Sequence, residues 1–480
     1  MKLLSRDTAN ITTNFPIKIV QFGEGNFLRA FADWMIDVLN EKADFNAGVA
    51  VVQPIEHGLV DLLEKQEGLY HLLMRGLSNG QVKNEQRLIS CIQRTLNPFT
   101  DPDAYLELAR IPELSLILSN TTEAGIVFDA DDNPDNGVLA KTFPGKLTQF
   151  LLARYHHFEG AADSGVGIIP CELIDRNGDK LFQAILQYVE LWGLSKEFGR
   201  WVQDSNYFAN TLVDRIVPGY PREEIDEIKQ ELGYDDQLVV ASELFHLWII
   251  EGPQALQEIF PAHKFGLNVK YVNDQTPYRS RKVRILNGAH TSMVPVGLLA
   301  GIETVKEAVE DSVLGPFIGE LIFEEIIPTM DLPEEELDQF ANDVIERFRN
   351  PFIRHELKSI SLNSISKFKV RVLPSILGYL SEKNRAPIRL CTAFASLIKL
   401  YLTADSIGIA LNDDQKYLEF FNSRRQETDI ELLISTILSN TDFWGQDLTK
   451  YPLLMDAVIN AYEKLVQQPI NESIEMIQSS

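Results

Sequence analysis

The sequence predicts an α/β domain with a mostly parallel sheet, followed by an all-α domain. The chain has 480 residues, which is too long for one typical domain. Up to about residue 275, short apolar runs rich in β-branched residues alternate with helical patterns. Beyond Lys282 the apolar spacing is helical almost throughout. We therefore expect one domain at residues 1–277 and a second at residues 278–480, with the polar stretch 273–278 as the hinge.

The first predicted strand, residues 17–22, is followed by two glycines and a helix. Gly23 and Gly25 come directly after the strand, and apolar residues within 31–39 then recur at helical spacing. In such a turn, backbone N–H groups and the helix dipole face the pyrophosphate of a dinucleotide. The pattern therefore favours a Rossmann-type domain. The usual third glycine is replaced by Leu28, so an ordinary strand-to-helix turn is the alternative.

A second predicted strand, residues 49–52, follows that helix, as a right-handed βαβ unit requires. An acidic residue at its end would bind the ribose hydroxyls of NAD. Gln53 stands there instead, and the next carboxylate is Glu56. An arginine for a 2′-phosphate is also missing from this end. The sequence thus favours NAD over NADP only weakly.

The remaining elements continue the same division. Further strand-like runs lie at residues 114–118, 166–169, 238–241 and 269–272. In the second domain, residues 337–348 have helical spacing after Asp331-Leu332-Pro333, where a proline suits the start of a helix.

Lys282, Asn287 and His290 form the most informative group of polar residues. On an α-helix these three would share an arc of about 140°. Lysine acts as a base near neutral pH when a pocket of low dielectric and nearby cations disfavour its charged form, and Arg281 and Arg284 are such neighbours. With amide and imidazole donors beside it, such a lysine can accept the hydroxyl proton of an alcohol, without a metal, while a hydride acceptor oxidises the carbon. An amphipathic helix with a polar face is the alternative.

Composition excludes some partners. With 44 Lys and Arg against 69 Asp and Glu, the formal net charge is −25, which argues against nucleic-acid and anionic-membrane surfaces. The apolar stretch 388–411 is interrupted by charges, so we expect a buried helix pair and no membrane span. Cys91, Cys171 and Cys391 are too scattered for a disulfide framework or a zinc site. No signal peptide is apparent, so we expect a cytoplasmic protein.

Five motifs resemble those of the mannitol dehydrogenase family, the polyol-specific long-chain dehydrogenases. They lie at residues 21–31, 119–126, 170–178, 211–219 and 282–291 and span nearly the whole chain. The resemblance implies an extended Rossmann-type domain, an all-helical domain and metal-free hydride transfer with NAD, or less favourably NADP. The residues of the motifs at 119–126 and 170–178 are most similar to those of the branch that reduces hexulosonates. This similarity implies a small sugar-acid substrate such as D-tagaturonate.

The resemblance also implies roles for individual residues. Lys282 corresponds to the general base, Asn177 and Asn287 to two amides that hold the substrate oxygen, and His290 to a substrate-orienting histidine. Asp214 corresponds to an acid near the substrate hydroxyls, although an ion pair with Arg215 is the plain alternative. The cofactor is expected to contact Phe22, Gly23, Gly25, Asn26, Phe27, Arg29, Gln53, Thr122 and Glu123.

A hexulosonate carries a carboxylate that a polyol lacks, and a basic side chain must bind it. Lys367 aligns with a family lysine close to the substrate, whereas the upstream family arginine falls on Ser359. The carboxylate partner therefore stays open between Lys358, Arg354 and Arg371.

Other functions compete with this interpretation. Another hexulosonate reductase or a polyol dehydrogenase of the same family is the first alternative. A lyase that forms a Schiff base on Lys282 and a nucleotide-sensing regulator are more remote. The sequence does not decide between a monomer and an oligomer.

Overall fold

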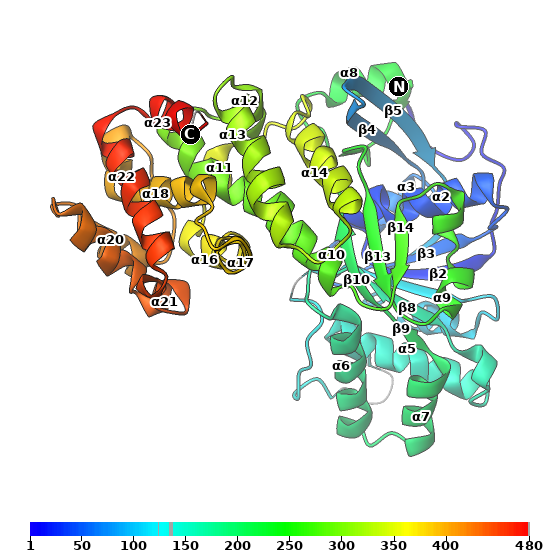
Figure 1. Cartoon of the computed structure of the whole chain (residues 1–480). Coiled ribbons are helices and arrows are strands. Elements are labelled where there is room, and N and C mark those ends of the chain that lie inside the picture. Colours follow the sequence, from blue (N-terminus) through cyan, green and yellow to red (C-terminus); the bar gives the residue numbers. More distant parts are fainter. Residues whose placement is uncertain (123, 134–137, 479–480) are drawn as a thin grey trace. The chain divides into compact units, whose positions relative to one another are not determined.

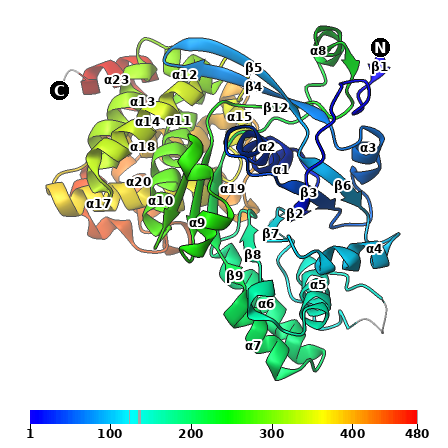
Figure 2. The same cartoon turned by 90° about the vertical axis from the view of Figure 1, so that its right-hand side faces the viewer.

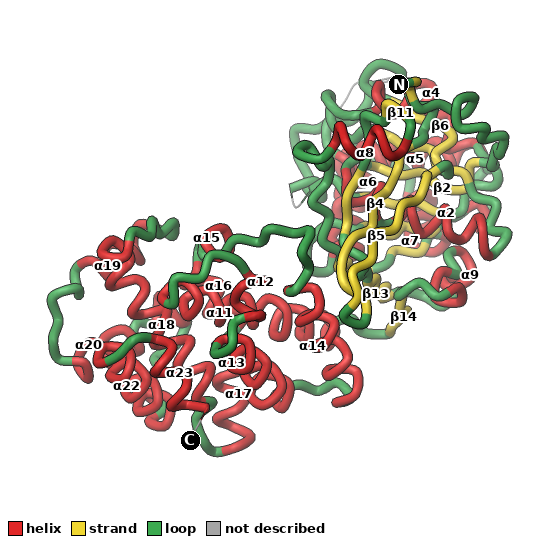
Figure 3. The backbone as a smooth tube through the Cα atoms, turned by 90° about the horizontal axis from the view of Figure 1, so that it is seen from above, coloured by secondary structure: helices red, strands yellow, loops and turns green. Residues whose placement is uncertain are grey.

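The computed structural model describes residues 1–122, 124–133 and 138–478. The chain folds into two compact units (Figure 1). One comprises Met1–Arg75 with Val82–Gln275, and the other comprises Gly76–Gln81 with Thr276–Ser480. The first unit is α/β and the second is built from helices, as the colours of Figure 3 show. The predicted fold class is therefore confirmed.

A six-stranded parallel sheet forms the centre of the first unit. Its strands in chain order are β2 (Ile17–Phe22), β3 (Gly48–Val52), β6 (Ile92–Leu96), β7 (Leu116–Ser119), β8 (Gly167–Pro170) and β9 (Tyr207–Phe208). Their order in the sheet is β6-β3-β2-β7-β8-β9. Strands β3 and β6 are added in turn on one side of β2. The chain then crosses to the other side of β2, where β7, β8 and β9 are added. This switch point, at the carboxyl ends of β2 and β7, is where open α/β sheets bind ligands.

Both faces of this sheet are buried, because alternate residues point to opposite sides. On β3, Val49 and Val51 pack in one core with α1 (Asn26–Ala30) and α2 (Ala32–Lys42). Ala50 and Val52 pack in the other core with α5 (Phe143–His157), α6 (Asn177–Leu191) and α7 (Lys196–Ser205). Figure 2 shows α2 and α5 on opposite sides of β2 and β3. The shorter helices of this unit are α3 (Val60–Lys65), α4 (Pro102–Glu107), α8 (Ile225–Leu232) and α9 (Ala255–Ile259).

Two of the predicted strands lie outside the main sheet. The run at 269–272 forms β14 (Val269–Val272), in a sheet ordered β10 (Asn210–Asp214), β13 (Leu247–Glu251), β14. The run at 238–241 forms β12 (Val240–Ser242), beside β4 (Tyr70–Ser78) and β5 (Gln81–Ile89). A two-stranded sheet joins β1 (Lys2–Leu3) to β11 (Tyr234–Asp235). Because β10 and β13 are antiparallel, the expectation of one mostly parallel sheet holds only for the central six strands.

Apart from Gly76–Gln81, which join β4 to β5, the described residues of the second unit form helices and their connections. The helices that carry or adjoin the predicted site residues are α10 (Thr276–Arg281), η4 (Lys282–Asn287), α11 (Gly288–Leu299), α14 (Glu334–Phe348), α15 (Leu357–Ile360) and α16 (Ser364–Arg371). The others are α12 (Val305–Glu310), α13 (Leu314–Glu320), η5 (Leu321–Ile326), α17 (Leu373–Lys383), α18 (Ile388–Thr403), α19 (Gln415–Asn422), α20 (Ile430–Leu438), α21 (Thr441–Trp444), α22 (Pro452–Gln467) and α23 (Ile470–Gln478).

The apolar stretch predicted as a helix pair is in fact one helix. It continues from α18 into a 3₁₀ turn, η7 (Ala404–Ile407). By length and composition alone, Ile388–Ile407 is apolar enough to cross a membrane, yet 67% of its apolar window is buried inside the protein. Helices α11 and α22 pack against it, so it serves as the central core helix of this unit.

Candidate active site

The glycine turn after β2 has the backbone geometry of a dinucleotide site. Gly23 has φ of +122°, which disfavours any residue with a Cβ, and a Cβ there would lie 2.9 Å from the Asn120 carbonyl oxygen. Its N–H donates to Val52 O at 3.0 Å, which ties the turn to the end of β3. Within the described chain, a Cβ on Gly25 would meet nothing within 4 Å. The turn is therefore tightly packed at Gly23 and open at Gly25. This openness lets a pyrophosphate approach the backbone N–H groups of the turn.

The side chain of Arg29, a residue predicted to contact the cofactor, holds the turn in place. Its guanidinium is buried and donates to Glu24 O at 3.0 Å, Leu238 O at 2.6 Å and Asn26 Oδ1 at 2.7 Å. All three nitrogens are thus engaged inside the protein. Its burial lowers the pKa of Arg29, and the nearby Tyr70 ring stacks under the guanidinium at 5.0 Å.

Two aromatic residues of the turn also have structural roles. The Phe22 ring is fully buried against Phe143, 4.9 Å between ring centroids, so only its main chain reaches the turn. Phe27 is half-buried and stacks on Phe31 at 4.9 Å.

Gln53 occupies the position of the usual ribose-binding acid, but its amide is already engaged. Nε2 donates to the carbonyl oxygens of Ile55 and Glu56 at 2.9 and 3.0 Å, and Oε1 accepts from Val60 N at 3.3 Å. The side chain is 3% exposed. In this structure Gln53 therefore shapes the loop that follows β3.

Glu172 organises the carboxyl ends of β7 and β8. Its carboxylate accepts from Ser119 Oγ, from Thr121 N and from Thr121 Oγ1, each at 3.0 Å. Asn120 adds a bond from Nδ2 to Cys171 O at 2.8 Å. Burial raises the pKa of Glu172, while these donors oppose the rise. No role was predicted for Glu172, although its place directly after a buried strand was the available signal.

Asn177 is fully buried and its amide is saturated. Nδ2 donates to Pro170 O and Glu172 O, and Oδ1 accepts from Gly178 N and Thr211 N at 2.9 and 2.8 Å. It therefore positions the loop after β8 in this structure, with no hydrogen bond left for a substrate oxygen.

Three further predicted residues lie near these strand ends. Asp214 is buried at the end of β10, and the guanidinium of Arg215 is directed at Glu243 O and Ala30 O. Thr122 is exposed and has φ of +83°, a strained value for threonine that is typical of functional sites. Glu123 lies outside the described residues.

In the second unit, Lys282 and Asn287 are the first and last residues of a π-helix. The segment was predicted as an α-helix, and the wider winding changes its geometry. Because the i→i+5 bonding of a π-helix widens each turn, Lys282 and Asn287 lie on one face of η4, at a smaller angle than the 140° expected for an α-helix. Both side chains are half-buried. Single π-helical turns of this kind occur frequently at functional sites.

His290 follows on α11 in an aromatic enclosure. Its ring stacks on Phe348 at 4.3 Å and meets the His355 ring edge-on at 4.9 Å. His290 is 8% exposed, and burial lowers the pKa of His355.

The neighbours of Lys282 are balanced by partners of their own. Arg281 Nη1 pairs with Glu336 at 2.8 Å, and Arg284 donates to Ser375 Oγ and Thr329 O. The cationic charge beside Lys282 is therefore partly neutralised by Glu336.

The basic candidates for the carboxylate differ in their surroundings. Arg354 is exposed and pairs with Glu303 and Glu356 at 3.2 and 3.3 Å, and Lys358 is exposed on α15. Arg371 is half-buried on α16, which packs against η4 and α11. Its Nη1 lies 3.5 Å from Thr291 Oγ1, next to His290 in the chain.

Lys367 lies one helical turn before Arg371 on the same helix. Its Nζ donates to Ile360 O at 2.9 Å. Burial lowers the pKa of Lys367, and the charge of Arg371 lowers it further. The structure thus brings Lys367 and Arg371 together beside the helix that carries His290.

Comparison with protein families supports the division into two units. Residues 17–261 match the mannitol dehydrogenase Rossmann domain, and residues 274–466 match the mannitol dehydrogenase C-terminal domain. The chain belongs to the mannitol dehydrogenase family.

Within this family the chain has close relatives. It is 47% identical to the altronate oxidoreductase of Bacillus subtilis (strain 168) over 460 residues, which cover 95% of this chain and 94% of the relative. Its fold is similar to that of a D-sorbitol dehydrogenase in substrate-free form (TM-score 0.82, 22% identity, 98% and 100% of the two chains). It is also similar to the mannitol 2-dehydrogenase of Pseudomonas fluorescens, solved with NAD and D-mannitol (TM-score 0.67, 21% identity, 100% of both chains).

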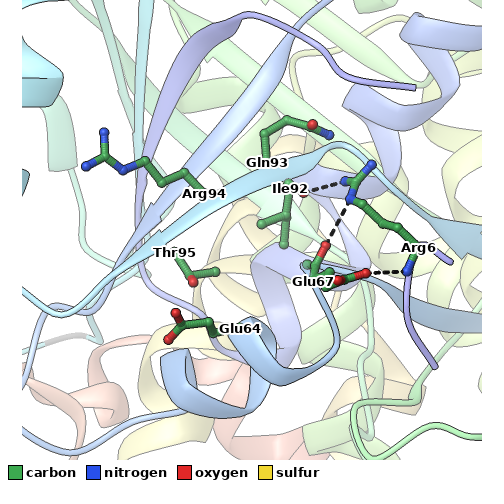
Figure 4. A pocket seen from close by; sticks show the side chains of 8 residues that line it. Arg6, Glu64, Glu67, Ile92, Gln93, Arg94 and Thr95 are labelled. Atoms are coloured by element: carbon green, nitrogen blue, oxygen red, sulfur yellow. Dashed lines mark hydrogen bonds between the residues drawn. The ribbon is translucent and has the colours of Figure 1, made fainter. Parts of the chain in front are cut away.

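Other features of this mannitol dehydrogenase family member lie outside the predicted site. A pocket of about 450 Å³ is lined by charged residues that include Arg6 and Glu67, as Figure 4 shows. Arg6 donates to Glu67 O and Ile92 O at 3.2 and 2.9 Å, so its charge is used to anchor the N-terminal segment. Among residues 1–122, 124–133 and 138–478, no group of three or more His, Cys, Asp or Glu is placed to hold a metal ion. Cys91, Cys171 and Cys391 are free thiols and buried.

Proposed function

We propose that this chain is an NAD-dependent altronate oxidoreductase. It is an oxidoreductase that acts on a CH–OH group, and it interconverts D-tagaturonate and D-altronate in hexuronate (galacturonate) breakdown. The observation that carries the proposal is the 47% identity, over 95% of the chain, to a protein of that name. The motifs at 119–126 and 170–178 independently favour the same branch of the family.

The residues around the glycine turn fit NAD. The open space above Gly25 accommodates a pyrophosphate, and the closely packed Gly23 fixes the turn that offers its backbone N–H groups. The mannitol 2-dehydrogenase with the same fold was solved with NAD. Asn26 and Phe27 are half-buried at the start of α1, and the strained Thr122 is exposed near the end of the neighbouring strand β7.

Lys282 moves the proton in the proposed reaction. When bound, NADH supplies the hydride that reduces the carbonyl carbon. Lys282 Nζ gives a proton to the carbonyl oxygen, and it takes that proton back when altronate is oxidised. Asn287, one π-turn further, donates a hydrogen bond to the same oxygen as negative charge develops on it. His290, held by Phe348 and His355, orients the substrate.

Arg371 and Lys367 bind the substrate carboxylate in this proposal. Arg371 offers a planar fork to a carboxylate, and it stands beside Thr291 on the side of α16 that packs against α11. Arg354 is less suited, because Glu303 and Glu356 already engage it in solvent. Asp214 contacts the sugar hydroxyls, and Asn177 acts by positioning the loop after β8.

The proposed reaction also indicates where the protein works. It consumes or regenerates NADH, a cofactor of the cell interior, which supports a cytoplasmic location. The substrate is a small sugar acid, and the acidic chain, at −25, offers no general surface for nucleic acid.

Substrate competition tests the proposal. Initial rates with NADH are measured on D-tagaturonate, D-fructuronate and D-fructose under the same conditions. We expect kcat/KM to be highest for tagaturonate and lowest for the uncharged ketose. A preference for fructuronate would make the chain a mannonate-forming reductase, and a preference for fructose would make it a polyol dehydrogenase.

A further inference from the structure

We propose that Glu24, the residue between the two glycines of the turn, binds the adenosine ribose hydroxyls of NAD and thereby selects NAD over NADP. This inference rests on the cofactor of the proposed function and assigns its specificity to one carboxylate. In most dinucleotide sites an acid at the end of the second strand has that task. Here that position is Gln53.

Gln53 is not available for the ribose in this structure. Its amide uses both donor hydrogens on Ile55 O and Glu56 O and accepts from Val60 N. It thereby folds the loop of residues 54–59 over the end of β3. The ribose acid must therefore come from another segment.

Glu24 reaches the same place from the adjacent strand. Strands β2 and β3 are paired in parallel, and the Gly23 N–H bond to Val52 O brings the turn directly beside Gln53. A Cβ placed on Gly58 would lie 2.1 Å from Glu24 Oε1 and 2.5 Å from Gln53 Oε1. The two side-chain oxygens therefore face one spot beneath Gly58, where the ribose of a Rossmann cofactor is expected.

The carboxylate of Glu24 is short of partners. The residue is 8% exposed, and Oε1 accepts one long hydrogen bond from Leu59 N at 3.3 Å. Within the part of the chain that the structure describes, Oε2 is buried with no hydrogen-bond partner. A buried carboxylate oxygen without a donor is costly, and such groups in native structures call for an explanation.

A ribose diol supplies what Glu24 lacks. Its two neighbouring hydroxyls offer two O–H donors to the two carboxylate oxygens, and these charge-assisted bonds are strong. When bound, the ribose takes the place of the long hydrogen bond from Leu59 N. A 2′-phosphate in the same place would set a second anion against the carboxylate. Arg29, the arginine of the turn, cannot offset this, because its nitrogens are engaged elsewhere.

The test measures cofactor binding without sugar, by the fluorescence of NADH and NADPH titrated with protein. In Glu24→Gln, which keeps the shape and the acceptor for Leu59 N, we expect the Kd for NADH to rise about tenfold or more. The affinity for NADPH is expected to stay or improve, so the preference for NADH falls by at least about an order of magnitude. Glu24→Asp, which keeps the charge, is expected to retain the preference for NADH.

Glu56→Gln is the matched control, because Glu56 is the exposed carboxylate of the same loop. We expect it to bind both cofactors as the parent does. Unchanged cofactor preference in Glu24→Gln, with the fold intact by circular dichroism, overturns the inference. So does a loss of preference in Glu56→Gln alone. If the protein does not reduce tagaturonate but its preference for NADH still depends on Glu24, only the proposed substrate is rejected.

Discussion

At the scale of single residues, the proposed chemistry concentrates on a few polar groups in the helical unit. Lys282, Asn287 and His290 come from one continuous segment, so their relative positions are set by local winding. Arg371 and Lys367 come from a different helix and are brought in by packing. The first set was named from sequence spacing and Lys367 from the family resemblance, while the choice of Arg371 over Lys358 and Arg354 required knowing that α16 packs against α11.

Replacing Lys282 by alanine removes the proton donor. We expect kcat for tagaturonate reduction to fall by about 100- to 10,000-fold, the usual contribution of a general acid or base. NADH binding, measured by fluorescence, is expected to persist. A small primary amine in the buffer should restore part of the rate. Near-normal turnover in Lys282→Ala, or equal damage from the control Lys306→Ala, a half-buried lysine of α12 that pairs with Glu310, would show that the proton moves by another route.

Removing Arg371 tests the carboxylate site. In Arg371→Ala we expect KM for tagaturonate to rise at least about tenfold, because a charge-assisted pair is lost. Turnover of fructose, which lacks the carboxylate, should change little. Arg354→Ala is the matched control and should leave both substrates unaffected. If Arg354→Ala raises KM for tagaturonate and Arg371→Ala does not, the assignment is reversed.

The buried Asp33 gives a pH dependence of stability. Burial raises the pKa of Asp33 from 3.8 to about 7, against hydrogen bonds from Gln21 and Tyr70. Between these two values the folded chain keeps a proton that the unfolded chain releases, so stability falls as pH rises through this window. Below pH 3.8 both states are protonated, and above about 7 the loss is complete.

Asp33→Asn is neutral at every pH and removes this loss. We measure the free energy of unfolding of both proteins in urea. The value for the variant minus that for the parent should increase by on the order of 2–3 kcal/mol between pH 5 and pH 8. Parallel pH profiles for the two proteins would contradict the assignment of the shift to Asp33.

At the scale of elements, the π-helix η4 is the feature that the sequence did not reveal. Apolar spacing predicts a helix, but i→i+4 and i→i+5 bonding share much the same pattern over six residues. The choice depends on packing by α14 and α16, which are remote in sequence. The strands themselves were predicted well, but their division among separate sheets was not. The apolar pattern of a strand does not specify which strand pairs with it.

At the scale of the whole molecule, two compact units each bury their own core. The division was visible in the sequence as a change from alternating to purely helical patterns, because each pattern records how its segment is buried. The roles of Arg29, Gln53 and Asn177 were not visible, because a polar side chain beside a site can bind either the ligand or the protein. A chain of net charge −25 that takes two anions must also gather its cations locally, as Lys367 and Arg371 do.

Cofactor binding should stabilise the two units unequally. NADH at about 100 times its Kd stabilises the binding unit by about 2.7 kcal/mol, which raises its melting temperature by roughly 5 °C or more. Four of the five tryptophans, Trp34, Trp192, Trp201 and Trp248, lie in the first unit, so their fluorescence reports that unit. We expect this transition to move with NADH while a calorimetric component from the helical unit stays in place. One common transition that shifts as a whole would show that the units unfold together.

The three buried thiols have a practical consequence. Burial raises the pKa values of Cys91, Cys171 and Cys391 well above that of a free thiol, so all three resist alkylation. A cysteine introduced on the surface would therefore react before the three native cysteines, which need not be removed first. Pairs of spin labels attached in this way, one on each unit, would allow pulsed electron resonance to measure the distance between the two units.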